Sequence, residues 1–333
     1  MKAIIPVAGA GTKLRPLTYT QPKALIPIAG KTILGVIIDQ LQNAGVDEFI
    51  FVIGYLGEKI QRYIAKNYPD LKHTFVNQTD RLGTGHAIWL TKEAVNNDEV
   101  IIVLGDTICD YSVKEVINSN TSQIGVRKVD DPRSFGVAEL DDDNKVLKVV
   151  EKPLIPKSNM AMVGIYFIKE TKELYEAISA HLSSRADEEG EYHLTNALQK
   201  MIDNGVTLKA FRVNNWFDCG KKETLLSTNA ILLKELSEEK QEAQTSYTRD
   251  TNVIIPPVSI ADGCNITHSI IGPNVSIGDN TTIKSSIIKN TIIGSYAELD
   301  EVVLHSSIIG SDAYIRGLSQ SLNIGDNTEI DLG

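Results

Sequence analysis

Up to about residue 240, short apolar runs alternate with segments in which apolar residues recur every three or four positions. The apolar runs favour buried strands, and the three-to-four spacing favours amphipathic helices. The runs are residues 3–7, 48–53 and 100–104, and the helical segments are residues 33–43, 59–65 and 84–95. This alternation predicts an α/β domain whose mainly parallel sheet is covered by helices and binds ligands beyond the carboxyl ends of its strands.

A predicted hairpin interrupts this pattern, with strands at residues 137–140 and 146–150 on either side of an acidic turn. Residues 164–168 indicate one more strand, and residues 225–236 have helical spacing. The stretch from Ser237 to Asp250 is rich in Glu, Gln, Ser and Thr. Such a composition is typical of a helix end followed by a linker, so we expect a second domain to begin near residue 250.

The chain beyond residue 250 repeats itself. Four similar nonamers occur: SIIGPNVSI from Ser269, TIIGSYAEL from Thr291, SIIGSDAYI from Ser307 and LNIGDNTEI from Leu322. Apolar residues recur in them every six positions, at Ile271, Ile277 and Ile283, Ile293 and Leu299, Ile309 and Ile315, and Ile324 and Ile330. A six-residue period fits neither a helix nor a two-faced strand, but it fits a hexapeptide-repeat parallel β-helix with apolar residues inside a triangular prism. A sandwich of short β-strands is the alternative.

Composition narrows the class of protein. The net charge of the 333 residues is −10, with acidic residues spread along the chain, which argues against a nucleic-acid or anionic membrane partner. The three cysteines and six histidines are scattered and lack the spacing of a metal site. Three widely spaced cysteines, an odd number, indicate reduced thiols in a cytoplasmic protein. No apolar run is long enough for a signal peptide or a membrane span.

A glycine-rich loop, residues 8–13, directly follows the first predicted strand. Its glycines let backbone N–H groups approach anionic oxygens, and Lys13 and Arg15 add positive charge, so phosphate is the expected ligand. A dinucleotide-binding turn is disfavoured, because Leu14 replaces its third glycine and Pro16 interrupts its helix. A phosphate-binding P-loop motif is absent, and a purely structural turn is the remaining alternative.

Asp106 ends the apolar strand at residues 100–104. A carboxylate there suits a hard cation such as Mg²⁺, which takes one or two carboxylates together with phosphate oxygens. The alternative is an ordinary turn or helix-capping aspartate. Similarly, Lys23 follows Pro22 in an apolar stretch, where a solvated surface lysine is the alternative to a phosphate contact.

Several motifs occur in a fixed order after the glycine loop. They are Pro22-Lys23-Ala24-Leu25-Ile26-Pro27, Leu82-Gly83-Thr84-Gly85, Leu104-Gly105-Asp106, Glu151-Lys152-Pro153 and Trp216-Phe217-Asp218-Cys219-Gly220. With this order and spacing, roughly the first 220 residues resemble the sugar-nucleotide pyrophosphorylases, in particular glucose-1-phosphate thymidylyltransferases and UTP–glucose-1-phosphate uridylyltransferases. The resemblance implies a Rossmann-like nucleotidyltransferase catalytic domain at residues 1–240 and a left-handed β-helix at residues 250–333.

The resemblance also implies roles for individual residues. Nucleotide contacts are expected from Ala8, Gly9, Gly11, Thr12, Lys13, Lys23, Gln78 and Gly83. Sugar contacts are expected from Gly136, Glu151 and Lys152, and Mg²⁺ ligands from Asp106 and Asp218. The expected catalytic set is Lys13, Lys23, Asp106, Lys152 and Asp218.

The implied reaction is a direct in-line displacement. A sugar 1-phosphate, with glucose 1-phosphate favoured, attacks the α-phosphorus of a nucleoside triphosphate, with dTTP or UTP favoured, and pyrophosphate leaves. Lys13, the loop amides and Arg15 are expected to favour the leaving pyrophosphate. Related loops have arginine where this chain has Lys13, so the planar pair of donors is lost while the charge is kept.

Two other functions stay open. In one, the β-helix also transfers an acyl group, with His305 the nearest candidate base. In the other, the chain is a regulatory or assembly protein that binds a sugar nucleotide with weak or lost turnover, an interpretation that only Lys13 supports. In each case we expect the β-helix to mediate self-association into a homo-oligomer.

Overall fold

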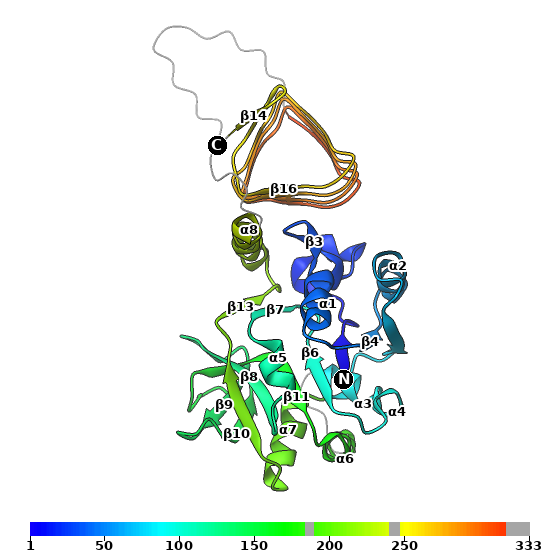
Figure 1. The fold of residues 1–333 in the computed structure, drawn as a ribbon, viewed down its shortest axis with the longest axis vertical. Helices are drawn as coiled ribbons and strands as arrows, with labels where there is room; N and C mark the ends of the chain where they lie inside the picture. Colours follow the sequence, from blue (N-terminus) through cyan, green and yellow to red (C-terminus); the bar gives the residue numbers. More distant parts are fainter. Residues whose placement is uncertain (184–189, 240–246, 318–333) are drawn as a thin grey trace. The chain divides into compact units, whose positions relative to one another are not determined.

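The computed structural model describes residues 1–183, 190–239 and 247–317, and the chain divides into two compact units, residues 1–228 and 229–333 (Figure 1). The boundary lies inside a long helix, α8 (Lys222–Glu239), so this helix contributes residues to both units. No helix among the described residues combines the length and the apolar character needed to cross a membrane.

The first unit contains a mixed sheet with strand order β10-β9-β11-β6-β1-β4-β5, in which β8 lies beside β11 and β12 beside β8. The strands are β1 (Lys2–Pro6), β4 (Glu48–Ile53), β5 (Lys72–Asn77), β6 (Val100–Val103), β8 (Ser122–Lys128), β9 (Gly136–Leu140), β10 (Val146–Glu151), β11 (Met160–Ile168) and β12 (Leu208–Arg212). β6, β1, β4 and β5 are mutually parallel, whereas β11 is antiparallel to β6. The parallel half therefore has its carboxyl ends at one edge, where a ligand site is expected.

Helices cover this sheet. They are α1 (Ile33–Asn43), α2 (Gly57–Asn67), α3 (Gly83–Trp89), α4 (Lys92–Val95), α5 (Val113–Ile117), α6 (Thr171–Leu182) and α7 (Leu194–Asp203). Smaller elements are the 3₁₀ helices η1 (Thr12–Leu14), η2 (Leu17–Tyr19) and η3 (Lys23–Leu25) and the strand pairs β2 (Pro27–Ile28) with β3 (Lys31–Thr32) and β7 (Thr107–Asp110) with β13 (Asn215–Asp218). A core of fully buried side chains, including Ile4, Ile102 and Leu198, joins the sheet to α3, α6 and α7.

The helix expected at residues 84–95 is broken, because α3 ends at Trp89 and α4 begins at Lys92. Between them, the buried hydroxyl of Thr91 donates a hydrogen bond to the Ile88 carbonyl at 2.6 Å. Threonine hydroxyls that bond nearby backbone groups compete with regular helix. The apolar period continued through the break, so the periodic pattern alone did not reveal it.

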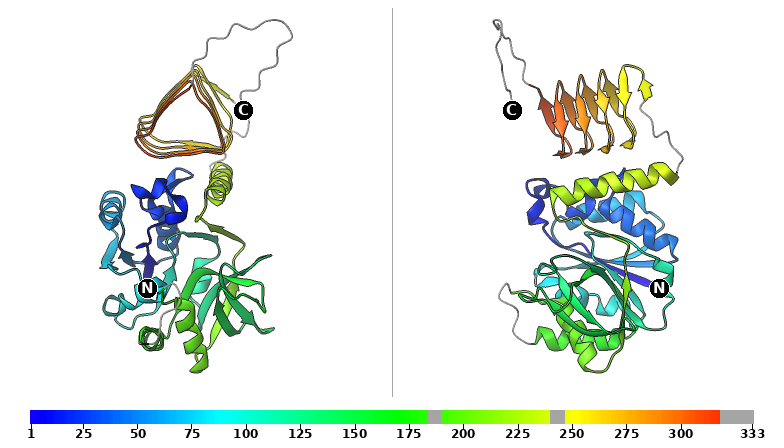
Figure 2. Two further views of the ribbon diagram at one scale, coloured as in Figure 1. Left: turned by 180° about the vertical axis from the view of Figure 1, so that it is seen from behind. Right: turned by 90° about the vertical axis from the view of Figure 1, so that its left-hand side faces the viewer.

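The second unit is a left-handed parallel β-helix, which confirms the predicted fold class. Its coils form a triangle in Figure 1 and stack along one axis in the right-hand view of Figure 2. The strands of its three sheets are β14 (Tyr247–Arg249), β15 (Asn252–Ile254), β18 (Ile270–Ile271), β21 (Ile287–Lys289) and β24 (Val303–His305); β16 (Val258–Ile260), β19 (Val275–Ile277), β22 (Ile292–Ile293) and β25 (Ile308–Ile309); and β17 (Asn265–Thr267), β20 (Thr282–Lys284), β23 (Glu298–Asp300) and β26 (Tyr314–Arg316).

Apolar side chains fill the triangular prism. Ile271, Ile277 and Ile283, six positions apart, are at most 2 % exposed. Equivalent positions in successive coils pair in parallel, as Ile271 does with Ile288 and Ile288 with Leu304. The nonamer that begins at Leu322 lies outside the described residues.

The stretch from Ser237 to Asp250 contains more regular structure than a helix end and a linker. Helix α8 continues to Glu239, and β14 pairs antiparallel with β15. Residues 240–246 lie outside the described residues. The polar composition concealed β14, because a strand of three residues at a sheet edge has no need of an apolar face.

Candidate active site

Two adjoining cavities lie at the carboxyl ends of β1 and β6 in the first unit. The glycine-loop lobe, about 430 Å³, is lined by residues 6–12 together with Gln78, Arg81 and Gly83 among others. The Glu151 lobe, about 440 Å³, is lined by residues 134–136, Glu151, Lys152 and further residues of β11 and α7. The residues that line both lobes are Gly11, Thr12, Lys23, Thr84, Leu104, Asp106 and Glu191. The two lobes therefore form one continuous site with a shared junction.

The glycine loop presents backbone donors to this site. Gly11 has φ +60°, and a Cβ there would lie 3.0 Å from Thr18 Cγ2 and 3.1 Å from Lys23 Cβ. The Thr18 hydroxyl donates to the Gly11 carbonyl at 2.8 Å and fixes the turn. Within the described residues, the N–H groups of Gly9, Ala10 and Gly11 have no hydrogen-bond acceptor. Neighbouring backbone N–H groups without acceptors form an anion-binding concavity.

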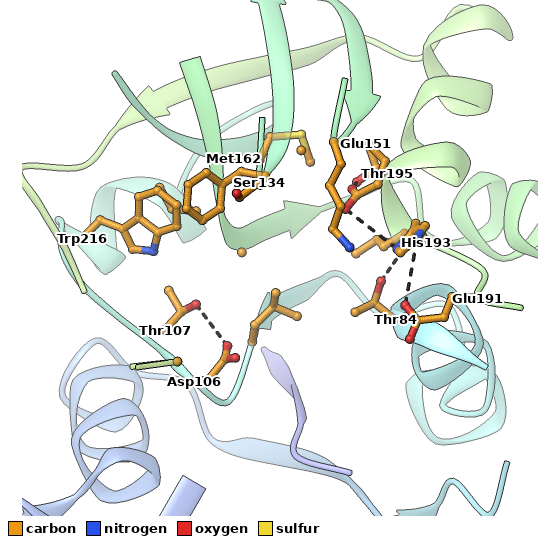
Figure 3. A pocket seen from close by; sticks show the side chains of 18 of the residues that line it. Thr84, Asp106, Thr107, Ser134, Glu151, Met162, Glu191, His193, Thr195 and Trp216 are labelled. Carbon is orange, nitrogen blue, oxygen red and sulfur yellow. Dashed lines mark hydrogen bonds and ion pairs between the residues drawn. The ribbon is translucent and has the colours of Figure 1, made fainter. Parts of the chain in front are cut away.

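An ion pair lies at the junction of the lobes. Lys23 Nζ lies 2.6 Å from Asp106 Oδ2, and the two side chains are 16 % and 40 % exposed. The other carboxylate oxygen of Asp106 lies 3.4 Å from the Thr107 hydroxyl (Figure 3). The lysine comes from η3 and the aspartate follows β6, so the pair joins two elements that are distant in the sequence.

The surroundings of Asp106 fit a hard cation. Residue 218 is brought close by its backbone, because Asp218 pairs with Thr107 across β13 and β7 and the Cys219 N–H donates to the Asp106 carbonyl at 3.1 Å. The side chain of Asp218 lies outside the described atoms. Among the described residues, no cluster of three or more His, Cys, Asp or Glu residues is present. A cation at Asp106 would therefore need oxygen ligands from phosphate, which is how Mg²⁺ commonly binds.

Gln78 and Gly83 meet in the wall of the glycine-loop lobe. The Gln78 side chain is buried and its amide donates to the Gly83 carbonyl at 3.1 Å. Gly83 has φ +89°, and a Cβ there would lie 2.8 Å from the backbone of Tyr192. Gly83 is therefore required for close backbone packing, and it fixes the rim of the lobe.

The Glu151 lobe combines carboxylates with a cation. Glu151 accepts a hydrogen bond from the Thr195 hydroxyl at 2.6 Å, and Lys152, with φ +39°, lies beside it at the end of β10. A Cβ at Gly136 would lie 3.2 Å from Thr195 Oγ1 and 3.3 Å from Glu151 Oε2, so only glycine leaves this wall open. Burial, together with the charge of Glu151, raises the pKa of Tyr166, which stays a neutral hydroxyl.

Other residues of the Glu151 lobe were not predicted. His193 lies between Glu151 and Glu191, with nitrogen–oxygen distances of 3.9 and 4.0 Å (Figure 3). The Trp216 ring packs edge-on against Phe135, and its buried N–H has no acceptor within the described residues. Trp216 belongs to the sequence motif at residues 216–220, but no role was predicted for it. No sequence pattern marked His193, because the residues around it come from different elements.

The predicted site residues collect at this site with one gap. All of those whose side chains are described line one or both lobes; the side chain of Asp218 lies outside the described atoms. Lys13 lines the Glu151 lobe, whereas the Arg15 guanidinium lies over the Tyr19 ring at 5.0 Å and lines neither lobe within the described residues. The expected contact of Arg15 with pyrophosphate stays a prediction.

This geometry defines an α/β domain whose glycine loop presents backbone N–H groups without acceptors, within the described residues, beside an acidic junction. Comparison with known proteins gives the family: the nucleotidyl transferase family model matches residues 2–235, and the chain belongs to this family. It is 29 % identical to the glucose-1-phosphate thymidylyltransferase of Streptomyces antibioticus, over 100 % of this chain and 99 % of that one. It is 32 % identical to the bifunctional protein GlmU of Methanocaldococcus jannaschii, over 98 % of this chain and 80 % of that protein.

Solved structures share the fold of the first unit. A UDP-glucose pyrophosphorylase complexed with UDP-glucose superposes with a TM-score of 0.62 at 22 % identity, over 70 % of this chain and 98 % of that chain. A putative glucose-1-phosphate thymidylyltransferase from Bacillus anthracis, in complex with sucrose, has a TM-score of 0.59 at 26 % identity, over 70 % of this chain and 95 % of that chain. The predicted nucleotidyltransferase fold and family are thereby confirmed.

Proposed function

We propose that this enzyme transfers a nucleoside monophosphate from a nucleoside triphosphate to a sugar 1-phosphate and releases pyrophosphate. The observation that carries this proposal is the junction of the two lobes at Lys23 and Asp106. A triphosphate bound along the glycine loop and a sugar phosphate bound beside Lys152 would meet at that junction. Names of relatives support the reaction, since they include glucose-1-phosphate thymidylyltransferases.

The nucleotide is assigned to the glycine-loop lobe. The backbone N–H groups of Gly9 to Gly11, with the neighbouring Ala8 and Thr12, face the phosphates. Gln78 and Gly83, which line the same lobe, are the proposed contacts of the base. Lys13 lines the Glu151 lobe next to Thr12 at the shared junction, and its proposed role is to neutralise the charge of the leaving pyrophosphate.

The sugar phosphate is assigned to the Glu151 lobe. Glu151, oriented by Thr195, accepts hydrogen bonds from sugar hydroxyls, and the open wall at Gly136 admits the ring. Lys152 and Lys23 bring together two anions that would otherwise repel each other. The attacking oxygen already carries negative charge, so the reaction needs no protein nucleophile, and the protein contributes positioning and charge neutralisation.

Asp106 and Asp218 are the proposed ligands of Mg²⁺. When bound, Mg²⁺ supplies charge neutralisation at the α-phosphate. The half-exposed Asp106 carboxylate lines the junction, and its ion pair with Lys23 orients it there.

The favoured substrates are dTTP or UTP and glucose 1-phosphate. These assignments rest on the relatives, since the Streptomyces protein is a thymidylyltransferase and a structural neighbour is a UDP-glucose pyrophosphorylase. A matrix of nucleoside triphosphates against sugar 1-phosphates, measured by pyrophosphate release, tests the proposal. Release with at least one pair supports it. Nucleotide binding without release for any pair would instead favour the regulatory protein.

The β-helix is proposed to mediate self-association and to consist of hexapeptide repeats. Truncation near Asp250 should lower the oligomeric mass measured by sedimentation, whereas an unchanged assembly would place the interface on the catalytic domain.

The GlmU relatives are named bifunctional, which keeps an acyltransferase β-helix as a second candidate function. His305, its nearest candidate base, is an exposed residue on β24. Free cysteines at positions 109, 219 and 264 support a cytoplasmic location.

A further inference from the structure

Arg81 is a cation that neither the sequence motifs nor the ion pairs explain. It is exposed and lines the glycine-loop lobe. Its guanidinium carbon lies over the ring of Tyr55, 5.5 Å from the ring centre. Within the described residues, no carboxylate pairs with it. A guanidinium that is stacked on one side and unpaired at its edge has its other side available to a ligand in the lobe.

Tyr55 is itself held in place. Its hydroxyl donates to the Tyr19 carbonyl at 3.0 Å, and its backbone N–H donates to the Ala8 carbonyl at 3.2 Å. The ring is therefore tied both to the glycine loop and to the segment that follows it. A guanidinium that rests on a fixed ring loses little freedom when a second flat group stacks on it.

The position of Arg81 along the chain indicates which part of the nucleotide it contacts. It lies three positions after Gln78 and two before Gly83, whose side chain and carbonyl are joined by a hydrogen bond in the wall of the glycine-loop lobe. The phosphate donors, Gly9 to Gly11, come from a different loop. With the base assigned to Gln78 and Gly83, the base is the target nearer along the chain for the guanidinium plane.

We infer that Arg81, supported by Tyr55, is the platform on which the nucleobase stacks. This inference rests on the proposed function for the assignment of the lobe to a nucleotide. Every base has a π face, so Arg81 sets affinity for nucleotides in general, and contacts at the base edge are left to other groups such as Gln78. Tyr55 is a positioning residue, because it acts through Arg81.

Binding of nucleotides to the full-length chain tests this inference. Calorimetry with dTTP, UTP and inorganic tripolyphosphate, each with Mg²⁺, compares the parent with Arg81→Ala and Arg81→Lys. Loss of the stacking plane should raise the Kd for both nucleotides by about five- to thirty-fold. Arg81→Lys should bind nucleotides almost as weakly as Arg81→Ala, since lysine keeps the charge but has no plane. The Kd for tripolyphosphate should not change.

The controls separate stacking from other effects. Arg62→Ala removes an exposed arginine of α2 that donates to the Glu58 carbonyl of its own helix, and it should leave nucleotide binding unchanged. Tyr55→Ala should weaken binding in the parent but add little in the Arg81→Ala background. Circular dichroism checks the fold, and Arg81→Gln replaces Arg81→Ala where that variant does not fold.

Three outcomes would overturn the inference. Full rescue by Arg81→Lys, or an equal loss of tripolyphosphate binding, would make Arg81 a phosphate contact. An unchanged nucleotide Kd in Arg81→Ala would mean that the Arg81 side chain stays in solvent and does not contact the nucleotide. These outcomes are independent of turnover: a chain that binds nucleotides through Arg81 but releases no pyrophosphate would refute the proposed function while leaving this inference intact.

Discussion

Lys23 offers the sharpest test of the shared junction. Its ammonium lies 2.6 Å from Asp106 and lines both lobes, so Lys23→Met removes a cation from both proposed substrates at once. At an effective dielectric constant of about 20, a contact of this length corresponds to about 6 kcal/mol of Coulomb energy. The exposure of Asp106, 40 %, lets water screen the pair, so the net effect on the free energy of unfolding should be about 1 kcal/mol.

The effect on turnover should be larger than the effect on stability. A charge-assisted hydrogen bond to phosphate is worth about 1.5–3 kcal/mol, so kcat/KM should fall by about ten- to 150-fold. Because the lysine lines both lobes, KM should rise for both substrates, and any part of the contact made only in the transition state should appear in kcat. Steady-state pyrophosphate release measures these constants, and urea unfolding measures the stability.

Lys31 provides the matched control. It pairs with Asp39 in the same unit but lies outside both lobes, so Lys31→Met should change stability slightly and kinetics not at all. Activity of Lys23→Met within about threefold of the parent, with the protein folded, would refute the reasoning. Lys23 would then be a structural partner of Asp106 alone.

Three further predictions use the same assays. Asp106→Asn and Asp218→Asn should each lower kcat by orders of magnitude with the fold intact, and near-normal activity with Mg²⁺ would remove that residue from the proposed metal site. Lys13→Arg should raise kcat/KM by about five- to a hundred-fold and Lys13→Ala should nearly abolish it, unless Lys13 points into solvent and the alanine variant matches the parent. In β21, truncating Ile288, which is 0 % exposed, to alanine should cost about 2–5 kcal/mol of unfolding free energy. The same change at its neighbour Ile287, 46 % exposed, should cost under about 1 kcal/mol, and equal losses would contradict the inward direction of Ile288.

The fold followed from local patterns to a large extent. The helix at residues 33–43 and the strand at 48–53 begin and end where the apolar spacing predicts. The six-residue period predicted the β-helix, because each inward position must be apolar for the coils to stack. Two features were missed for different reasons: the apolar period continues through the helix break at Thr91, and the short edge strand β14 has no such period.

The sequence by itself determined the family, because the glycine loop, the motif order and the period of the β-helix are local patterns that specify backbone shape and burial. The tertiary structure decided which distant side chains meet. Lys23 reaches Asp106 across 83 positions, and Thr195 reaches Glu151 across 44. It also stacks Arg15 on Tyr19 and places Arg81 in the lining of the glycine-loop lobe. Such contacts depend on how strands and loops pack against one another, and no spacing along the chain records the distance between side chains that packing brings together.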